Sequence, residues 1–123
     1  MNTQFKKGII EMCVIHMIND KDMYGFEVID SLSKEIDVNE NTIYPILRRL
    51  TDQGYFETYS EATNVGAPRK YYRITAKGSV KKVEYQKEWD KFLKGVYRIL
   101  GGENHEVWLF KCNQTAIEQL SHQ

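Results

Sequence analysis

The hydrophobic periodicity of the chain changes at Gly54, and this change limits the folds that the chain can adopt. Before Gly54, apolar side chains recur at intervals of three and four residues, which is the spacing of amphipathic helices. After Gly54, apolar and polar residues alternate, which is the spacing of half-buried strands. The expected helices cover residues 4–18, 23–36 and 39–54, and the expected strands cover residues 55–60 and 69–74.

The segment 61–68 separates the two expected strands. It is polar and carries Gly66 and Pro68 near its end, so it predicts a β-hairpin with a long loop. Three helices followed by a hairpin that carries Arg69 and Lys70 beside its loop have the order of a winged helix-turn-helix. The sequence therefore predicts a mainly α fold with a small β-hairpin.

The helix expected at residues 39–54 has an apolar face and a polar face. Its apolar stripe consists of Ile43, Ile46, Leu47 and Leu50. Its other faces carry hydroxyl, guanidinium and amide groups, which suit a DNA groove, on Thr42, Tyr44, Arg48, Arg49 and Gln53. Pro45 is compatible with this helix if the regular part begins near residue 41 or 42, because proline then stands in or just after the first turn. The alternative is an ordinary amphipathic helix with a solvated face.

The first two expected helices serve for packing. In residues 4–18 the expected packing face comprises Phe5, Ile9, Met12, Cys13, His16 and Met17. In residues 23–36, Phe26, Ile29 and Leu32 are expected to face inward. Gly25 would let a neighbouring helix approach closely, and Asp22 is placed to cap the second helix.

A fourth helix is expected after Thr75, which can serve as its N-cap. Apolar residues then repeat at spacings of four and three, which gives a heptad-like seam of Tyr85, Trp89, Phe92, Val96 and Ile99, widened by Leu93, Tyr97 and Leu100. A long helix with such a face needs a partner, and a second copy of the chain is the simplest one. We therefore expect a winged helix-turn-helix DNA-binding domain at residues 1–75, a dimerisation helix at 76–100 and a tail at 101–123.

Charge is unevenly distributed along a chain whose formal net charge is zero. Residues 11–40 contain eight acidic and two basic residues, whereas residues 41–82 contain eight basic and three acidic residues. A chain that segregates charge in this way can present one basic face to a polyanion.

Other classes of function find little support in the sequence. It has no nucleophile elbow, no glycine-rich phosphate loop and no cluster of His, Asp and Glu at ligand spacing, so we expect no enzyme, cofactor or metal site. Cys13 and Cys112 form no CxxC pattern and are expected to be thiols. No apolar run reaches the roughly 18 residues of a membrane span and no signal-peptide core is present, so we expect a cytoplasmic protein.

Three separated motifs resemble the PadR family of bacterial transcriptional regulators. They are Tyr24-Gly25, the run Asn-Thr-Ile-Tyr-Pro-Ile-Leu-Arg-Arg-Leu at 41–50 followed by Gly54, and the run Arg-Lys-Tyr-Tyr-Arg-Ile-Thr at 69–75 followed by Gly78. The motifs have the family's order and spacing, and the resemblance covers roughly the first hundred residues. It implies a homodimeric repressor whose third helix enters the major groove of double-stranded DNA, while the wing reaches the flanking minor groove or backbone.

Candidate DNA-binding residues come from these motifs and from the basic clustering around them. They are Asn41, Thr42, Tyr44, Arg48, Arg49, Arg69 and Lys70. Asn41 stands where many family members have a smaller residue, so its own contact is open. The resemblance also gives the first helix an intersubunit role, and the expected dimer contacts are Phe5, Ile9, Cys13, Trp89, Phe92, Val96 and Ile99.

Trp89 has two interpretations that the sequence leaves open. In the short, multidrug-sensing members of the family, a tryptophan at the matching place faces its twin across the dimer and sandwiches flat aromatic ligands. On that resemblance, Trp89, Tyr85 and Phe92 are candidate effector-binding residues for a small planar aromatic ligand. Alternatively, Trp89 is a seam residue that fills the interface.

The sequence does not predict a structure for the tail. Gly101-Gly102 is expected to end the fourth helix, and the apolar patch 107–110 has no counterpart in the family pattern.

A winged-helix module that binds protein rather than DNA would be compatible with the neutral net charge. The clustering of Arg48, Arg49, Arg69 and Lys70 argues against that alternative.

Overall fold

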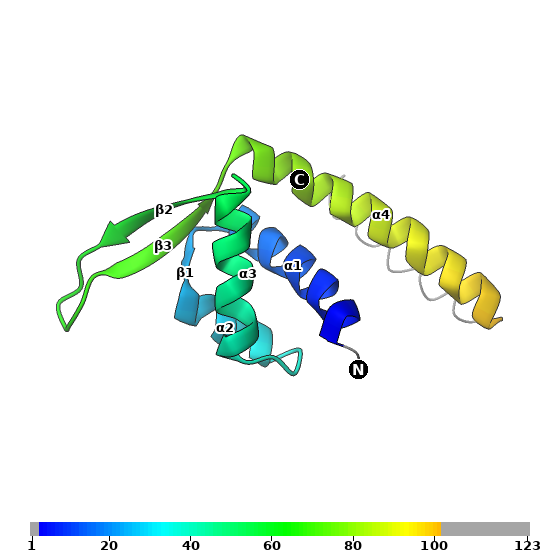
Figure 1. Ribbon diagram of the computed structural model, residues 1–123, viewed down its shortest axis with the longest axis horizontal. Helices are drawn as coiled ribbons and strands as arrows, with labels where there is room; N and C mark the ends of the chain where they lie inside the picture. Colours follow the sequence, from blue (N-terminus) through cyan, green and yellow to red (C-terminus); the bar gives the residue numbers. More distant parts are fainter. Residues whose placement is uncertain (1–2, 102–123) are drawn as a thin grey trace, which may run out of the picture. The chain divides into compact units, whose positions relative to one another are not determined.

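The computed structural model describes residues 3–101, and within them it shows four helices and a three-stranded antiparallel sheet (Figure 1). The elements are α1 (Thr3–Asp20), β1 (Met23–Tyr24), α2 (Gly25–Ser33), α3 (Glu40–Asp52), β2 (Phe56–Glu61), β3 (Arg69–Ile74) and α4 (Ala76–Leu100). The strand order is β1-β3-β2. The predicted fold class, mainly α with a small hairpin and a long C-terminal helix, is confirmed.

The hairpin of β2 and β3 forms the wing, and it projects from the helices with its loop at the tip (Figure 1). Phe56 pairs with Ile74 and Glu61 pairs with Arg69 at the two ends of the register. β3 covers the predicted residues, and β2 begins and ends one residue later than expected. Alternation of polar and apolar residues was therefore sufficient to locate the wing.

β1 was not foreseen, and the assignment of Met23 and Tyr24 to a helix was wrong. Met23 pairs with Tyr72 and Tyr24 pairs with Tyr71, so these two residues extend the sheet, and α2 begins only at Gly25. The backbone N–H of Tyr24 donates a hydrogen bond to the Glu27 carboxylate at 3.2 Å. The first turn of α2 is thus stabilised by Glu27, and the expectation that Asp22 caps α2 was wrong.

The hydrophobic core joins α1, α2, α3 and the inner face of the sheet. From α1 it takes Ile10, Val14, Ile15 and Ile18, which are at most 1% exposed. The expected packing face of α1 was therefore correct only in part: Cys13 and Met17 pack against the margin of the core, Ile9 and Met12 are half-buried, and His16 is exposed. Apolar residues surround α1 on most sides, so periodicity alone does not select the face that is buried.

In α2 the buried residues are Gly25, Val28 and Leu32. Phe26 is 63% exposed, so the expectation that it faces inward was wrong. The reason is that Gly25 is the residue turned toward α3, and the next residue on a helix points about 100° away. A Cβ atom on Gly25 would lie 2.6 Å from Cε1 of Tyr44, which confirms that this glycine permits a close helix approach.

α3 buries its apolar stripe as predicted. Ile43, Ile46, Leu47 and Leu50 are at most 1% exposed, and each such burial stabilises the fold by roughly 1.5–3 kcal/mol. The helix begins at Glu40, one residue earlier than expected, so Pro45 stands on an exposed side of its second turn. Proline inside a helix costs about 3 kcal/mol, which the four buried side chains together outweigh.

A Schellman motif ends α3 at Gly54. Gly54 has a φ of +86°, its N–H donates to the Thr51 carbonyl at 3.0 Å, and the Tyr55 N–H donates to the Leu50 carbonyl at 3.0 Å. Glycine adopts this left-handed conformation without a steric penalty. The change of periodicity seen in the sequence therefore coincides with a helix end that requires glycine.

Thr75 and Gly78 join the sheet to α4. The Gly78 N–H donates to Oγ1 of Thr75 at 3.0 Å, which confirms Thr75 as the N-cap of α4. The Thr75 N–H in turn donates to the Tyr55 carbonyl at 3.0 Å. A Cβ atom on Gly78 would lie 2.2 Å from the Tyr55 carbonyl oxygen and 2.7 Å from Cγ1 of Ile74, so this position has no room for a side chain.

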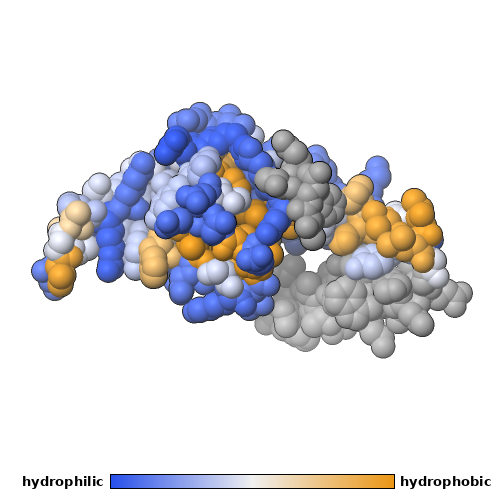
Figure 2. All heavy atoms as spheres, turned by 60° about the horizontal axis from the view of Figure 1, so that its bottom comes forward, coloured by the Kyte–Doolittle hydropathy of each residue, from blue (hydrophilic) through white to orange (hydrophobic). Residues whose placement is uncertain are grey.

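The chain divides into two compact units, residues 1–85 and 86–123, and α4 passes from the first into the second. Within the second unit, Phe92, Ile99 and Leu100 are 55%, 85% and 72% exposed. Figure 2 shows hydrophobic surface gathered at the C-terminal end of α4. Gly101 has a φ of +88°, and its N–H donates to the Tyr97 carbonyl at 3.0 Å, so the helix ends where expected.

Some expectations fall outside the described part of the chain or stay untested. The apolar patch 107–110, Cys112 and the side chain of Phe5 lie outside it. The predicted domain division at residue 75 stays a prediction. No helix among the described residues is long and apolar enough to cross a membrane.

We predict that Gly78→Ala lowers the free energy of unfolding by about 1–3 kcal/mol, because the new methyl group meets a backbone carbonyl that cannot turn away. Urea denaturation followed by circular dichroism would measure the change. Gly8→Ala is the matched control, since a Cβ atom on Gly8 meets nothing within 4 Å. The control should be as stable as the unmodified protein or up to about 1 kcal/mol more stable. Equal effects of the two substitutions would contradict the prediction.

Candidate nucleic-acid interface

The outer face of α3 presents the residues that the sequence selected for reading DNA. Asn41, Tyr44 and Arg48 are exposed and Thr42 is half-buried, while the opposite face of the helix is locked in the core. The Tyr44 side chain packs over Gly25 of α2, which holds its ring in place and leaves the residue 42% exposed. α3 therefore offers a hydroxyl, a guanidinium and an amide from a rigid support.

Arg49 does not lie with the other candidate DNA-binding residues of α3. Its guanidinium forms an ion pair with Glu11 of α1, and Glu11 also accepts a hydrogen bond from the Tyr85 hydroxyl at 3.3 Å. Glu11 is only 14% exposed at its side chain. One carboxylate thus links α1, α3 and Tyr85 of α4, and the positive charge of Arg49 is directed toward the protein.

The wing carries its two candidate cations on opposite faces of β3, because neighbouring residues in a strand alternate. Lys70 lies on the inner face, with its Nζ 5.6 Å from the ring centroid of Tyr72. Burial raises the pKa of Tyr72, and so does the neighbouring Tyr44, whereas the nearby Arg48 lowers it. Tyr72 is thus in contact with Lys70 of the wing and lies within electrostatic range of Tyr44 and Arg48 of α3.

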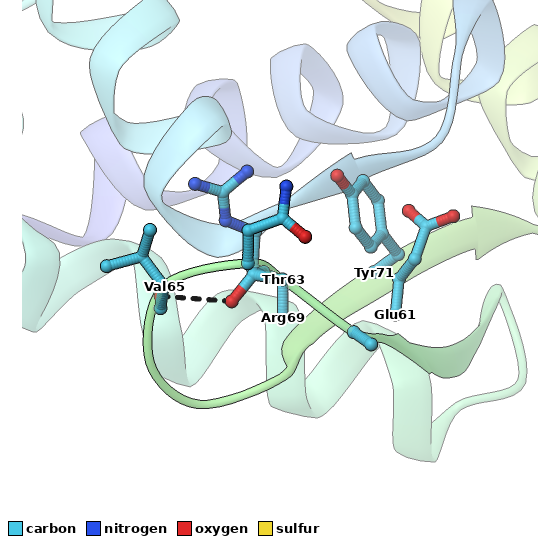
Figure 3. Close-up of a pocket in the computed structure, with 7 residues that line it drawn as sticks. Glu61, Thr63, Val65, Arg69 and Tyr71 are labelled. Carbon is cyan, nitrogen blue, oxygen red and sulfur yellow. Dashed lines mark hydrogen bonds between the residues drawn. The ribbon is translucent and has the colours of Figure 1, made fainter.

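Arg69 lies on the outer face of the wing, where its guanidinium sits 4.5 Å from the ring centroid of Tyr24. It borders a pocket of about 300 Å³ at the wing tip, shown in Figure 3 and lined by Glu61, Ala62, Thr63, Asn64, Val65, Arg69 and Tyr71. Oγ1 of Thr63 donates a hydrogen bond to the Val65 carbonyl at 3.0 Å, so the loop folds back on itself. Val65, which lines the pocket, is 89% exposed.

The outer face of the sheet also carries a row of aromatic rings. The rings of Tyr59 and Tyr71 stack with centroids 5.4 Å apart and an interplanar angle of 11°, and Tyr71 meets Tyr24 edge to face at 5.4 Å. The guanidinium of Arg73 lies 4.6 Å from the Tyr59 ring centroid, so cations cover both ends of the row. These contacts stiffen the wing.

Asp22 connects this row to the helical part of the protein, a role that the sequence analysis missed. Its Oδ2 accepts hydrogen bonds from the Tyr59 hydroxyl at 2.7 Å and from Nε of Arg73 at 3.3 Å. These hydrogen bonds raise the pKa of Tyr59 and the pKa of Arg73. The register of the hairpin places Tyr59 opposite Tyr71, but nothing in the sequence places Asp22 beside either strand.

The candidate effector residues divide between the two compact units. Tyr85 belongs to the first unit, where its hydroxyl bonds to Glu11 and Nζ of Lys81 lies 4.7 Å from its ring centroid. Trp89 and Phe92 belong to the second unit, where Trp89 is half-buried and Phe92 is 55% exposed. Within the described residues, no group of three or more His, Cys, Asp or Glu side chains is arranged to hold a metal ion.

Comparison with known proteins identifies relatives of this arrangement. The model of the PadR-like family of transcriptional regulators matches residues 14–84. An uncharacterised protein of Lysinibacillus sphaericus is 31% identical over 101 residues, which are 73% of this chain and 93% of that protein.

Solved structures agree with the family match. The crystal structure of a PadR-like transcriptional regulator from Bacillus cereus is similar with a TM-score of 0.73 and 34% identity, over 82% of this chain and 100% of that one. A PadR family transcriptional regulator from Eggerthella lenta has a TM-score of 0.73 and 30% identity, over 81% of this chain and 88% of that one. The resemblance noted in the three sequence motifs is thus confirmed, and the chain belongs to the PadR-like family of transcriptional regulators.

Proposed function

We propose that this chain is a homodimeric repressor that binds an inverted-repeat operator and is released from DNA by a small planar aromatic ligand. Membership of the family implies regulation of transcription through DNA binding. The observations that carry the proposal are the exposed polar face of α3, with Asn41, Tyr44 and Arg48, and the exposed cations Arg69 and Lys70 on the wing. Two elements that are distant in sequence thereby both present groups that suit a nucleic acid.

In this proposal α3 enters the major groove with Thr42, Tyr44 and Arg48 toward the bases. Arg48 is the residue suited to specificity, because a guanidinium can form two parallel hydrogen bonds with a guanine. Tyr44 is held on Gly25, so it loses little conformational freedom on binding. Asn41 stands near the helix N-terminus, where backbone N–H groups and side chains meet phosphates.

The wing supplies phosphate contacts in the proposal. Arg69 and Lys70 lie on opposite faces of β3, so the strand can place one cation on each side of the backbone or groove edge it approaches. Arg49 is assigned a different role from the one expected. Its ion pair with Glu11 fixes α3 against α1 rather than contacting DNA.

Dimerisation is assigned to α4 and α1. The exposed apolar residues of α4 within the second unit, Phe92, Ile99 and Leu100, continue the predicted seam of Trp89 and Val96. Pairing with a second copy would remove this surface from water. Two copies of α3 related by a two-fold axis would then read half-sites about one helical turn apart. Ile9 and Cys13 remain the expected contacts from α1.

The proposed effector site is centred on Trp89 and Phe92. A planar ligand between two indole rings gains stacking and apolar burial without requiring a particular hydrogen-bond pattern. Tyr85 stands four residues before Trp89, and its hydroxyl is bonded to Glu11. We therefore propose that Tyr85 connects α4 to the winged part. The ligand would instead bind at Trp89 and Phe92, which follow Tyr85 in the helix.

We predict that changing Arg69 and Lys70 together to alanine weakens DNA binding by a similar factor on all sequences. Each lost phosphate contact should reduce the slope of log affinity against log salt by about 0.9. Fluorescence anisotropy with a labelled fragment of the protein's own promoter region, at several salt concentrations, would measure both quantities. The control is Lys34→Ala with Lys87→Ala, which removes the same charge from exposed sites elsewhere. Equal salt slopes for the two double variants would disprove the wing contact, and no binding above competitor DNA by the unmodified protein would disprove the repressor.

We predict that Arg48→Ala and Arg49→Ala act on different properties. Arg48→Ala should reduce discrimination between the operator and other sequences by about 1–3 kcal/mol while leaving the unfolding transition unchanged. Arg49→Ala should destabilise the protein, because it leaves the nearly buried Glu11 without its ion-pair partner. Competition binding and thermal unfolding of both variants distinguish the roles. If Arg49→Ala lost specificity without losing stability, Arg49 would be a DNA-contacting residue, and the proposed structural role would be wrong.

We predict that Trp89→Ala weakens the binding of a planar aromatic dye about tenfold or more, because stacking on each ring contributes roughly 0.5–1.5 kcal/mol beyond burial and the dimer has two. Dye anisotropy is the measurement, since the substitution removes one of the two tryptophans on which intrinsic fluorescence depends. Trp89→Phe keeps a flat ring and should give an intermediate affinity. Size-exclusion chromatography must show that the variants remain dimers. A dimeric Trp89→Ala protein with unchanged affinity rules out the sandwich and leaves Trp89 as a seam residue.

A further inference from the structure

We propose that Asp22 is a positioning residue for DNA binding, which holds the wing at a set orientation relative to the reading face of α3. The inference rests on the proposed function and extends it to a residue that makes no DNA contact itself. Asp22 lies in the turn between α1 and β1, and its side chain is 34% exposed. It lies outside the hairpin, directly before β1, and its side chain reaches the outer face of the wing.

One carboxylate oxygen of Asp22 binds both strands of the hairpin. Oδ2 accepts the Tyr59 hydroxyl of β2 at 2.7 Å and Nε of Arg73 of β3 at 3.3 Å. β2 is the far strand in the order β1-β3-β2, so it has no backbone pairing with β1. The Tyr59 hydrogen bond therefore links the far strand directly to the turn after α1.

Arg73 strengthens this link with its other groups. Its Nη1 lies 3.6 Å from the Glu57 carboxylate on β2, and its guanidinium covers the Tyr59 ring at 4.6 Å from the centroid. A hydrogen bond between an ionised donor and an ionised acceptor is roughly twice as strong as a neutral one. The charge of Arg73 is thus shared between two carboxylates and an aromatic face, and its use here is structural.

The wing residues proposed to bind phosphate stand close to this cluster in the sheet. Tyr59 pairs with Tyr71, and the next residues along the hairpin are Lys70 and Arg69. An ordered wing presents these cations to DNA without first losing conformational freedom, whereas a loosened wing must be ordered during binding. Ordering side chains at an interface costs free energy, so a loosened wing binds more weakly.

Asp22→Ala tests the inference because it has two effects, and these would change the affinity for DNA in opposite directions. Removing an acidic residue makes the protein less repulsive to DNA, which by itself strengthens binding. Loss of the positioning contact weakens binding, and we expect roughly a five- to tenfold lower affinity, the ordering cost of two side chains. Asp30→Ala is the matched control, since it removes an exposed carboxylate that pairs only with Lys34 four residues away in the described ion pairs. The affinity of the Asp30→Ala protein for DNA should be unchanged or slightly higher.

The same substitution made in a protein that lacks the wing cations distinguishes a positioning role of Asp22 from general destabilisation. In the protein with Arg69→Ala and Lys70→Ala, the wing has lost the contacts that Asp22 is proposed to position. Asp22→Ala should therefore cause no further weakening there, although it weakens binding when the wing cations are present. The salt slope of Asp22→Ala should also move toward that of the double variant. A simple loss of fold would reduce affinity equally in both backgrounds.

Tyr59→Phe is a milder variant that keeps the ring stacked on Tyr71, keeps the net charge and removes only the hydrogen bond to Asp22. It should weaken binding less than Asp22→Ala but in the same direction. Asp22→Ala and Tyr59→Phe proteins that bind like the unmodified protein overturn the positioning role, and so does equal weakening in both backgrounds. Absence of operator binding by the unmodified protein is a distinct result, because it overturns the proposed function itself.

Discussion

The burial of one face of α3 is the constraint on which the other features of the structure depend. Ile43, Ile46, Leu47 and Leu50 enter a core built from α1, α2 and the inner face of the sheet. Once these four side chains are buried, the rotation of α3 about its axis has no freedom left, because a turn by one residue would expose apolar surface and bury a guanidinium. The same rotation turns Tyr44 toward Gly25 and Arg49 toward Glu11. The outward face of α3 is therefore a consequence of its inward face.

Carboxylates from the acidic part of the chain pair with some of the cations and so reduce the number available to a partner. Glu11 forms an ion pair with Arg49, and Asp22 binds both Arg73 and Tyr59. These pairs join elements that hydrophobic contacts alone would leave less precisely oriented, since apolar burial has no preferred direction. The basic stretch of the sequence thus presents less free charge than its composition suggests. Charge at residues 41–82 serves partly to hold α1, α3 and the wing together.

The accuracy of the sequence predictions follows the range of the interactions involved. The wing and α3 were located to within one or two residues, because alternation, helical spacing and a C-terminal glycine are local signals. Met23 and Tyr24 were placed in a helix because their pairing partners lie about fifty residues away in the sequence. Phe26 was assigned to the core for a related reason, since only contact with α3 determines which side of α2 is buried. The separation of Arg48 from Arg49 likewise required knowing where Glu11 lies.

Apart from β1, the helices and strands could be located from the sequence alone, and so could the hydrophobic stripe of α3 and the helix stop at Gly54, because each follows from backbone preference or from spacing within a few residues. It also carried the three motifs by which the family is recognised. Only the tertiary structure decided the use of each charged and aromatic side chain. Lys70 lies over the Tyr72 ring, Arg69 turns to the opposite face, and Asp22 reaches two strands. These assignments depend on contacts between residues far apart in the chain, and no periodicity encodes such contacts.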